Sequence, residues 1–112
     1  MTDYKKVRIE VIYKAHYCLP CVYMDETVRG ILSKYKGRVE YRRIDYMKGE
    51  GKKRFLDLSC TLFGEDGVYK KLRLAPVPSL FIDGTLVFDA IPPRFDLERA
   101  IEAAINEKKV SP

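Results

Sequence analysis

Apolar and polar positions along the chain follow two different periods, and they divide its first half into strands and a helix. Over Val7–Tyr13 the apolar residues alternate and are rich in β-branched types, which predicts a strand. From Cys21 onward apolar residues recur every three or four positions, which predicts a helix that continues to Tyr35 and ends at Gly37. Val39–Tyr46 predicts a second strand. Because a helix joins the two strands, we expect them to be parallel.

The second half predicts another helix, a hairpin and a final helix. Apolar spacing indicates a helix over Lys52–Phe63 that stops at Gly64, with a turn directly after it. Two short apolar runs flank Asp83-Gly84-Thr85, which is typical of a tight hairpin turn. The last amphipathic segment predicts a C-terminal helix with Asp96 as its N-cap. The expected order is therefore βαβ, helix, β-hairpin, helix, in an α/β fold.

Length and composition limit this fold to one domain with its own core. The chain has 112 residues, of which 46% are hydrophobic and 33% charged, so we expect a single domain over residues 1–112 and not a disordered chain. The net charge is +5, and residues 36–54 alone carry eight basic and three acidic side chains. A surplus confined to one short segment indicates a local basic patch, most simply a solvated face, and argues against a nucleic-acid-binding protein.

The cysteines and the N-terminal sequence bear on where the protein works. Met1–Glu10 contains no uncharged apolar run, and no window approaches the length of a membrane span, so we expect no membrane association. Three cysteines are an odd number, and two of them form the tight pair Cys18-Leu19-Pro20-Cys21. This pattern argues against a secreted disulfide scaffold and favours redox chemistry or metal binding in the cytoplasm.

The cysteine pair stands between a predicted strand and a predicted helix, where thiol chemistry is favoured on physical grounds. Unpaired N–H groups and the positive end of the helix dipole stabilise a thiolate at the helix N-terminus and lower its pKa. We therefore expect Cys18 to be the exposed nucleophile. Cys21, one turn further on, would attack a mixed disulfide formed on Cys18 and so resolve it.

The element order, the cysteine pair after the first strand, and Val77-Pro78 before the third strand together resemble the thioredoxin/glutaredoxin superfamily. The resemblance implies a four-stranded mixed sheet of order 2-1-3-4 with helices on both faces. It also implies thiol–disulfide oxidoreductase activity on protein disulfides, without a cofactor, with a reductase or glutathione as the electron donor. Pro78 would then be cis beside the cysteines, and Val77 would offer its backbone to an extended substrate. Tyr17, directly before the first cysteine, would contact the substrate as well.

Some positions depart from the family pattern. The chain resembles the short, glutaredoxin-sized version, which lacks the additional N-terminal strand and helix of thioredoxins. Tyr17 stands where thioredoxins carry a tryptophan. Ile12 occupies the position of the buried acidic residue that assists the resolving cysteine in thioredoxins. Glu10 is the alternative candidate, because alternation along a strand puts it on the same face as Ile12.

Several alternatives remain open from the sequence. Cys18 and Cys21, with His16, could instead form a zinc or copper site in a metal carrier or sensor, since thiolate pairs suit soft metals. A non-catalytic interaction domain is a third reading. Cys60 is expected to pack in the core as a small hydrophobe. The long segment before Pro78 suggests a partner surface or a homodimer contact, with packing onto the domain as the simpler expectation.

Overall fold

The computed structural model describes residues 6–110, and the predicted domain ends at residues 1 and 112 lie outside them. Strands and helices follow one another in the predicted order. Their bounds are β1 (Val7–Tyr13), α1 (Leu19–Arg29), the 3₁₀ helix η1 (Leu32–Tyr35), β2 (Val39–Asp45), α2 (Gly49–Tyr69), β3 (Ser79–Ile82), β4 (Thr85–Phe88) and α3 (Arg94–Val110). Among the described residues, no helix is long and apolar enough to cross a membrane.

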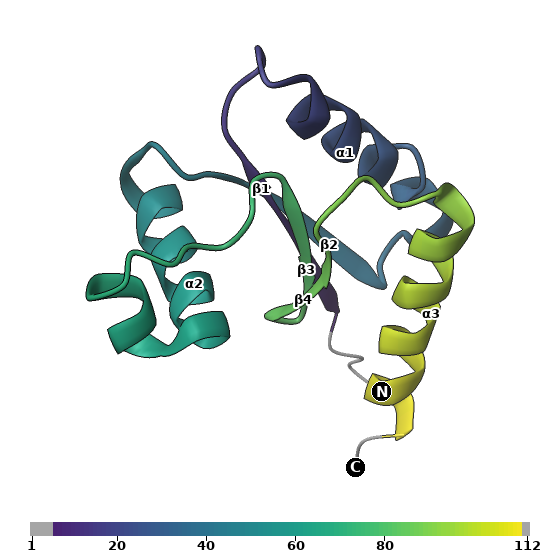
Figure 1. Cartoon of the computed structure of the whole chain (residues 1–112). Helices are drawn as coiled ribbons and strands as arrows, with labels where there is room; N and C mark the ends of the chain where they lie inside the picture. Colours follow the sequence, from purple (N-terminus) through teal and green to yellow (C-terminus); the bar gives the residue numbers. More distant parts are fainter. Residues whose placement is uncertain (1–5, 111–112) are drawn as a thin grey trace.

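The strands form one mixed sheet in the order β2-β1-β3-β4, as predicted. β1 runs parallel to β2, with Val7 opposite Val39, and antiparallel to β3, with Ile12 opposite Ser79. Figure 1 shows α1 and α3 on one side of the sheet and α2 on the other. The expected four-stranded α/β fold with helices on both faces is thus confirmed.

Each face of the sheet has its own hydrophobic core, because β1 is buried on both sides. Alternate residues of β1 point to opposite faces. One core joins β1 and β3 to α1 and α3, and its most buried side chains are Ile9, Val11, Met24, Val28, Leu80, Leu97 and Ile101. The other core joins the sheet to α2 through Ile12, Ile44, Phe55, Leu58, Ala75 and Phe81. The central strand is consequently buried at every position except Arg8.

The hairpin between β3 and β4 has the predicted turn. Asp83 and Gly84 have φ values of 51° and 83°, so both central residues lie in the left-handed region. A type I′ turn requires this conformation, and Asp-Gly is among the pairs that adopt it most readily.

The first helix is shorter than the apolar spacing predicted. α1 begins at Leu19, two residues before the predicted start, and ends at Arg29 with Gly30 as C-cap. The segment to Tyr35 is a separate 3₁₀ helix. Ile31 and Tyr35 nevertheless pack into the same core as α1, which is why their spacing continues the helical pattern.

The second helix departs from the prediction at both ends. α2 begins at Gly49, three residues early, and continues through the predicted turn to Tyr69. Gly64 still interrupts it, with φ 76° and ψ 163°, a conformation that glycine adopts without steric cost. The chain therefore bends at Gly64 and resumes as helix at once, in the residues where we expected a turn. In α3 the start at Arg94 places Asp96 in the first turn, so its predicted role as N-cap is wrong.

The buried carboxylate of Asp25 links α1 to the edge strand β2 by hydrogen bonds. Asp25 is 8% exposed. It accepts hydrogen bonds from the Tyr41 hydroxyl of β2 and, at 3.0 and 3.1 Å, from the Arg29 guanidinium one turn along α1. Burial of the phenol, followed by its hydrogen bond to Asp25, raises the pKa of Tyr41 well above its ordinary value.

This contact predicts a loss of stability in alkali. A group whose pKa is raised on folding contributes stability that is complete below its unfolded pKa, here about 10, and is lost as the pH rises toward its folded pKa. We expect the free energy of unfolding to fall above about pH 10, and to fall less steeply in Tyr41→Phe. Denaturant unfolding at a series of pH values measures both slopes. Equal slopes in the two proteins would contradict the assignment.

Candidate functional site

Cys18 and Cys21 lie at the start of α1 and are joined as a disulfide, with a Cα–Cα distance of 5.3 Å. Cys18 is the N-cap residue, and its carbonyl oxygen accepts the N–H of Val22 at 3.0 Å. Pro20 fits the first turn because the N–H groups there have no partner within the helix. The sequence predicted this position for the pair, although the helix starts earlier than expected.

The two sulfurs have different surroundings. Cys21 is fully buried in the core side of α1, whereas Cys18 is half-buried. The backbone N–H of Lys14 donates to Cys21 Sγ at 3.4 Å. Lys14 directly follows β1, so the end of the central strand holds the inner sulfur. An approaching molecule therefore reaches the disulfide at Cys18 and not at Cys21.

One aromatic and one apolar side chain flank the half-buried Cys18 in the chain. Tyr17 is 67% exposed and Leu19 is 58% exposed. The His16 ring meets the Tyr17 ring edge-on at 6.2 Å, and the Lys14 ammonium lies 5.9 Å from the centre of the same ring. Such exposed apolar residues beside a reactive cysteine form a surface to which another molecule can bind.

The loop before β3 reaches the same end of the sheet. The Val77–Pro78 peptide bond is cis. Because Ser79 pairs with Ile12 in an antiparallel register, Pro78 follows the sheet to the end of β1, where the cysteine loop begins. Val77 is 37% exposed, and the Ser79 hydroxyl is buried without a hydrogen-bond partner among the described residues. The structure thus brings Val77 and Pro78 toward the cysteines from the opposite end of the sequence.

Glu10 is buried as alternation suggested, but its carboxylate is already engaged. It is 0% exposed, and both its oxygens accept hydrogen bonds from Arg54 of α2, at 2.7 and 2.8 Å. The hydrogen bond to Glu10 raises the pKa of Arg54, against the lowering effect of burial. Because both oxygens of Glu10 are engaged by Arg54 of α2, the structure does not support Glu10 as the substitute acid.

Sequence reasoning missed the role of Arg54, which it assigned to the solvated basic patch. The signal was available in principle, since a carboxylate on a buried strand needs a partner of opposite charge. The other patch residues do face solvent. Arg43 pairs with Asp45 at 3.3 Å, while Arg42 and Lys48 are exposed beside the start of α2. Because α2 begins at Gly49, the cations at 52 and 53 fall beyond its first turn, where the positive end of the helix dipole would disfavour them most.

The remaining candidates lie apart from the pair. Cys60 is half-buried on α2 and belongs to neither core cluster, so the expectation of core packing is wrong. Within residues 6–110, no group of three or more His, Cys, Asp or Glu side chains is arranged to hold a metal ion. His16 is exposed and contacts the Tyr17 ring. The three ligands of the alternative metal site are therefore not assembled when the disulfide is closed.

Comparison with solved structures identifies the architecture. The chain is similar to the germline-specific thioredoxin Deadhead from Drosophila melanogaster, with a TM-score of 0.54 and 18% identity over 88% of this chain and 80% of that one. The fold is thioredoxin-like.

Two further solved structures match the chain with comparable scores. Thioredoxin O2 from Arabidopsis thaliana, in its oxidised state, has a TM-score of 0.52 and 18% identity over 88% of this chain and 74% of that chain. A structure described as a malarial protein has a TM-score of 0.59 and 14% identity, covering 88% of this chain and 97% of that one. No family model matches the chain, and no curated protein does.

Proposed function

We propose that the protein is a thiol–disulfide oxidoreductase that reduces or exchanges protein disulfides through Cys18 and Cys21. One observation carries the proposal: a half-buried cysteine caps a helix N-terminus and is paired with a fully buried cysteine one turn later. The thioredoxin-like fold supports it, because the solved thioredoxins it resembles share this architecture.

The order of the reaction steps follows from the different surroundings of Cys18 and Cys21. In the reduced protein, the thiolate of Cys18 attacks one sulfur of a substrate disulfide, and the other substrate sulfur leaves as a thiolate that takes up a proton. Cys21 then loses its proton and attacks the Cys18 sulfur, which closes the internal disulfide and releases the second substrate thiol. Two electrons pass from the protein dithiol to the substrate. The Lys14 N–H would stabilise negative charge on Cys21 during the second step.

Substrate binding is assigned to Tyr17, Val77 and Pro78. Tyr17 offers an exposed aromatic surface directly before the nucleophile. Val77 would pair its backbone with an extended segment of the substrate, as in the family that the sequence resembles. An exposed residue next to a cis-proline at the end of the central strand suits this role.

The proposal also includes the source of electrons and the compartment. A reductase or glutathione would return the pair to the dithiol state, because each cycle consumes two electrons. A cytoplasmic location is supported by the odd number of cysteines, with Cys60 left as a free thiol.

Thiol trapping tests this function directly. The reduced protein is incubated with a disulfide-bonded protein such as insulin, quenched with an alkylating reagent, and analysed by mass. We expect Cys18 and Cys21 to become protected together, in step with the appearance of substrate thiols, while Cys60 stays alkylated throughout. Metal analysis of the reduced protein runs alongside. Stoichiometric zinc or copper with no electron transfer to insulin would reject the proposal in favour of the metal-binding alternative.

A further inference from the structure

An apolar pocket opens on the α2 side of the molecule, between the loop after β2 and the loop before Val77. Its volume is about 330 Å³. The residues that line it are Tyr46, Met47, Lys52, Phe55, Leu56 and Leu74. Phe55 is 4% exposed, and its ring lies at 41° to the ring of Tyr46 with ring centres 4.8 Å apart, so this pair packs into the core on the α2 side. Met47 and Leu74 are 62% and 47% exposed. The pocket therefore has an aromatic base packed into the core and an exposed apolar rim.

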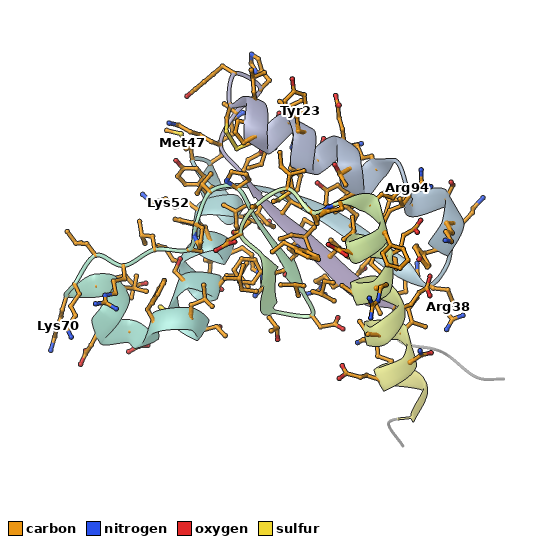
Figure 2. The ribbon with its side chains drawn as sticks, turned by 45° about the vertical axis from the view of Figure 1, so that its right-hand side comes forward. Tyr23, Arg38, Met47, Lys52, Lys70 and Arg94 are labelled. Carbon is orange, nitrogen blue, oxygen red and sulfur yellow. A yellow bond between two sulfur atoms is a disulfide. The ribbon has the colours of Figure 1, made fainter. Side chains whose placement is uncertain are left out.

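The pocket lies at the same end of the sheet as the cysteine pair, because each follows the carboxyl end of one of two parallel strands. The N–H of Tyr46 donates to the Tyr13 carbonyl at 3.3 Å, and Tyr13 immediately precedes the residue whose N–H contacts Cys21 Sγ. On its other side, Leu74 is three residues before Val77, a stretch of chain that spans at most about 10 Å. Figure 2 shows Met47 and Lys52 toward the end of the molecule where α1 begins. A segment extended along Val77 could thus reach the pocket within a few residues.

The charges around this opening have one predominant sign. Lys52 lines the pocket, and Lys48 and Arg73 are exposed in the two loops that border it. The exposed acidic residue closest in sequence to Lys48 and Lys52 is Glu50, in the first turn of α2. An excess of cations around a concave apolar site attracts a negatively charged partner and repels a positively charged one.

We propose that this pocket takes an apolar side chain of the substrate, and that the protein prefers disulfides in acidic segments with a large apolar residue about two to four positions from the reacting cysteine. This inference rests on the proposed function and specifies its substrate class. Apolar area in the pocket supplies affinity. The lysines and the arginine select the charge of the flanking residues.

Peptides with a chromogenic leaving group test the preference. Each peptide carries one cysteine as a mixed disulfide with thionitrobenzoate, and the protein is Cys21→Ser with Cys60→Ser. The Cys18 thiolate attacks the peptide sulfur, so the coloured thionitrobenzoate thiolate leaves and the reaction stops at the Cys18–peptide disulfide. We expect an acidic peptide with leucine three positions from its cysteine to react about tenfold faster than its glycine counterpart, because burying a leucine side chain is worth about a factor of ten or more.

Charge selection has its own measurement. Exchanging the acidic flanks for lysines should slow the leucine peptide about tenfold at low salt, and added salt should shrink this difference because it screens exposed charges. In Leu74→Ser and Met47→Ser, the leucine preference should disappear while the reaction with the small disulfide dithiobis-nitrobenzoate keeps its rate. Leu72→Ser is the matched control, since Leu72 is 80% exposed, two residues from Leu74, and does not line the pocket.

The outcomes separate this inference from the proposed function. Equal rates for the leucine and glycine peptides, with a normal rate for the small disulfide, would overturn the pocket assignment and leave the oxidoreductase intact. Loss of the preference in Leu72→Ser to the same extent as in Leu74→Ser would also overturn it. Failure of Cys18 to react with any of the disulfides would overturn both.

Discussion

Replacing Cys18 by serine is expected to abolish the reduction of protein disulfides, to below one thousandth of the wild-type rate. Serine offers a hydroxyl that is not ionised at neutral pH, so the attacking thiolate is lost. The buried Cys21 does not substitute for it, because its sulfur is 0% exposed. An insulin reduction assay with a chemical dithiol as electron donor measures the effect, after subtraction of the rate without protein.

The companion variant Cys21→Ser should behave in the opposite way. It retains the nucleophile and lacks the resolving thiol, so it should accumulate a mixed disulfide with the substrate that diagonal electrophoresis displays. Cys60→Ser is the matched control and should reduce insulin like the wild type, since Cys60 lies on α2, away from the start of α1. Equal trapping by Cys18→Ser and Cys21→Ser would show that the two roles are assigned wrongly.

The largest expected change in stability comes from Arg54→Leu, which we expect to lower the free energy of unfolding by about 3 to 5 kcal/mol. The reason is that the substitution leaves the buried carboxylate of Glu10 without its charge partner. Glu10 is fully buried in the central strand, and Arg54 supplies both hydrogen bonds that its oxygens receive from side chains. Removal of one partner of a buried pair leaves an uncompensated charge in a medium of low polarity. Urea unfolding followed by circular dichroism gives the value.

A double variant separates the loss of a charge partner from the loss of a contact. Glu10→Leu combined with Arg54→Leu should recover most of the lost stability, because an apolar pair of similar volume often replaces a buried ion pair without cost. Arg8→Leu serves as the control. It breaks the exposed Arg8–Glu40 pair at 3.0 Å and should cost less than about 1 kcal/mol. If Arg54→Leu cost no more than Arg8→Leu, the buried pair would not stabilise the fold as we argue.

The fold could be predicted from the sequence where local patterns decide the structure. The β-branched residues and the alternation in Val7–Tyr13 predicted a strand, and Asp83-Gly84 is a turn whose chemistry permits few other conformations. Cys18 and Cys21 were identified from their spacing and from their place between a predicted strand and a predicted helix. These signals act within a few residues, so no knowledge of the rest of the chain is needed to interpret them.

The remaining features depend on contacts between distant parts of the chain. The partners Glu10 and Arg54 are 44 residues apart, and only the packing of α2 on the sheet brings them together. Gly64 was correctly identified as a break, but its neighbours do not reveal whether a helix resumes afterwards. The pocket beside Leu74 forms between two loops that follow different elements, and neither loop carries a motif for it.

The edge position of β2 bears on how the protein behaves at high concentration. This strand has seven residues and lies at the end of the sheet, where unpaired N–H and C=O groups could template aggregation with another molecule. Glu40, Arg42 and Arg43 are exposed along it. If β2 strands of two molecules paired antiparallel about Arg42, the Arg42 side chains of the two molecules would lie opposite each other. Like charges directly opposite each other are destabilising. Neutral replacements at Arg42 and Arg43 would therefore lower colloidal stability before they altered the fold.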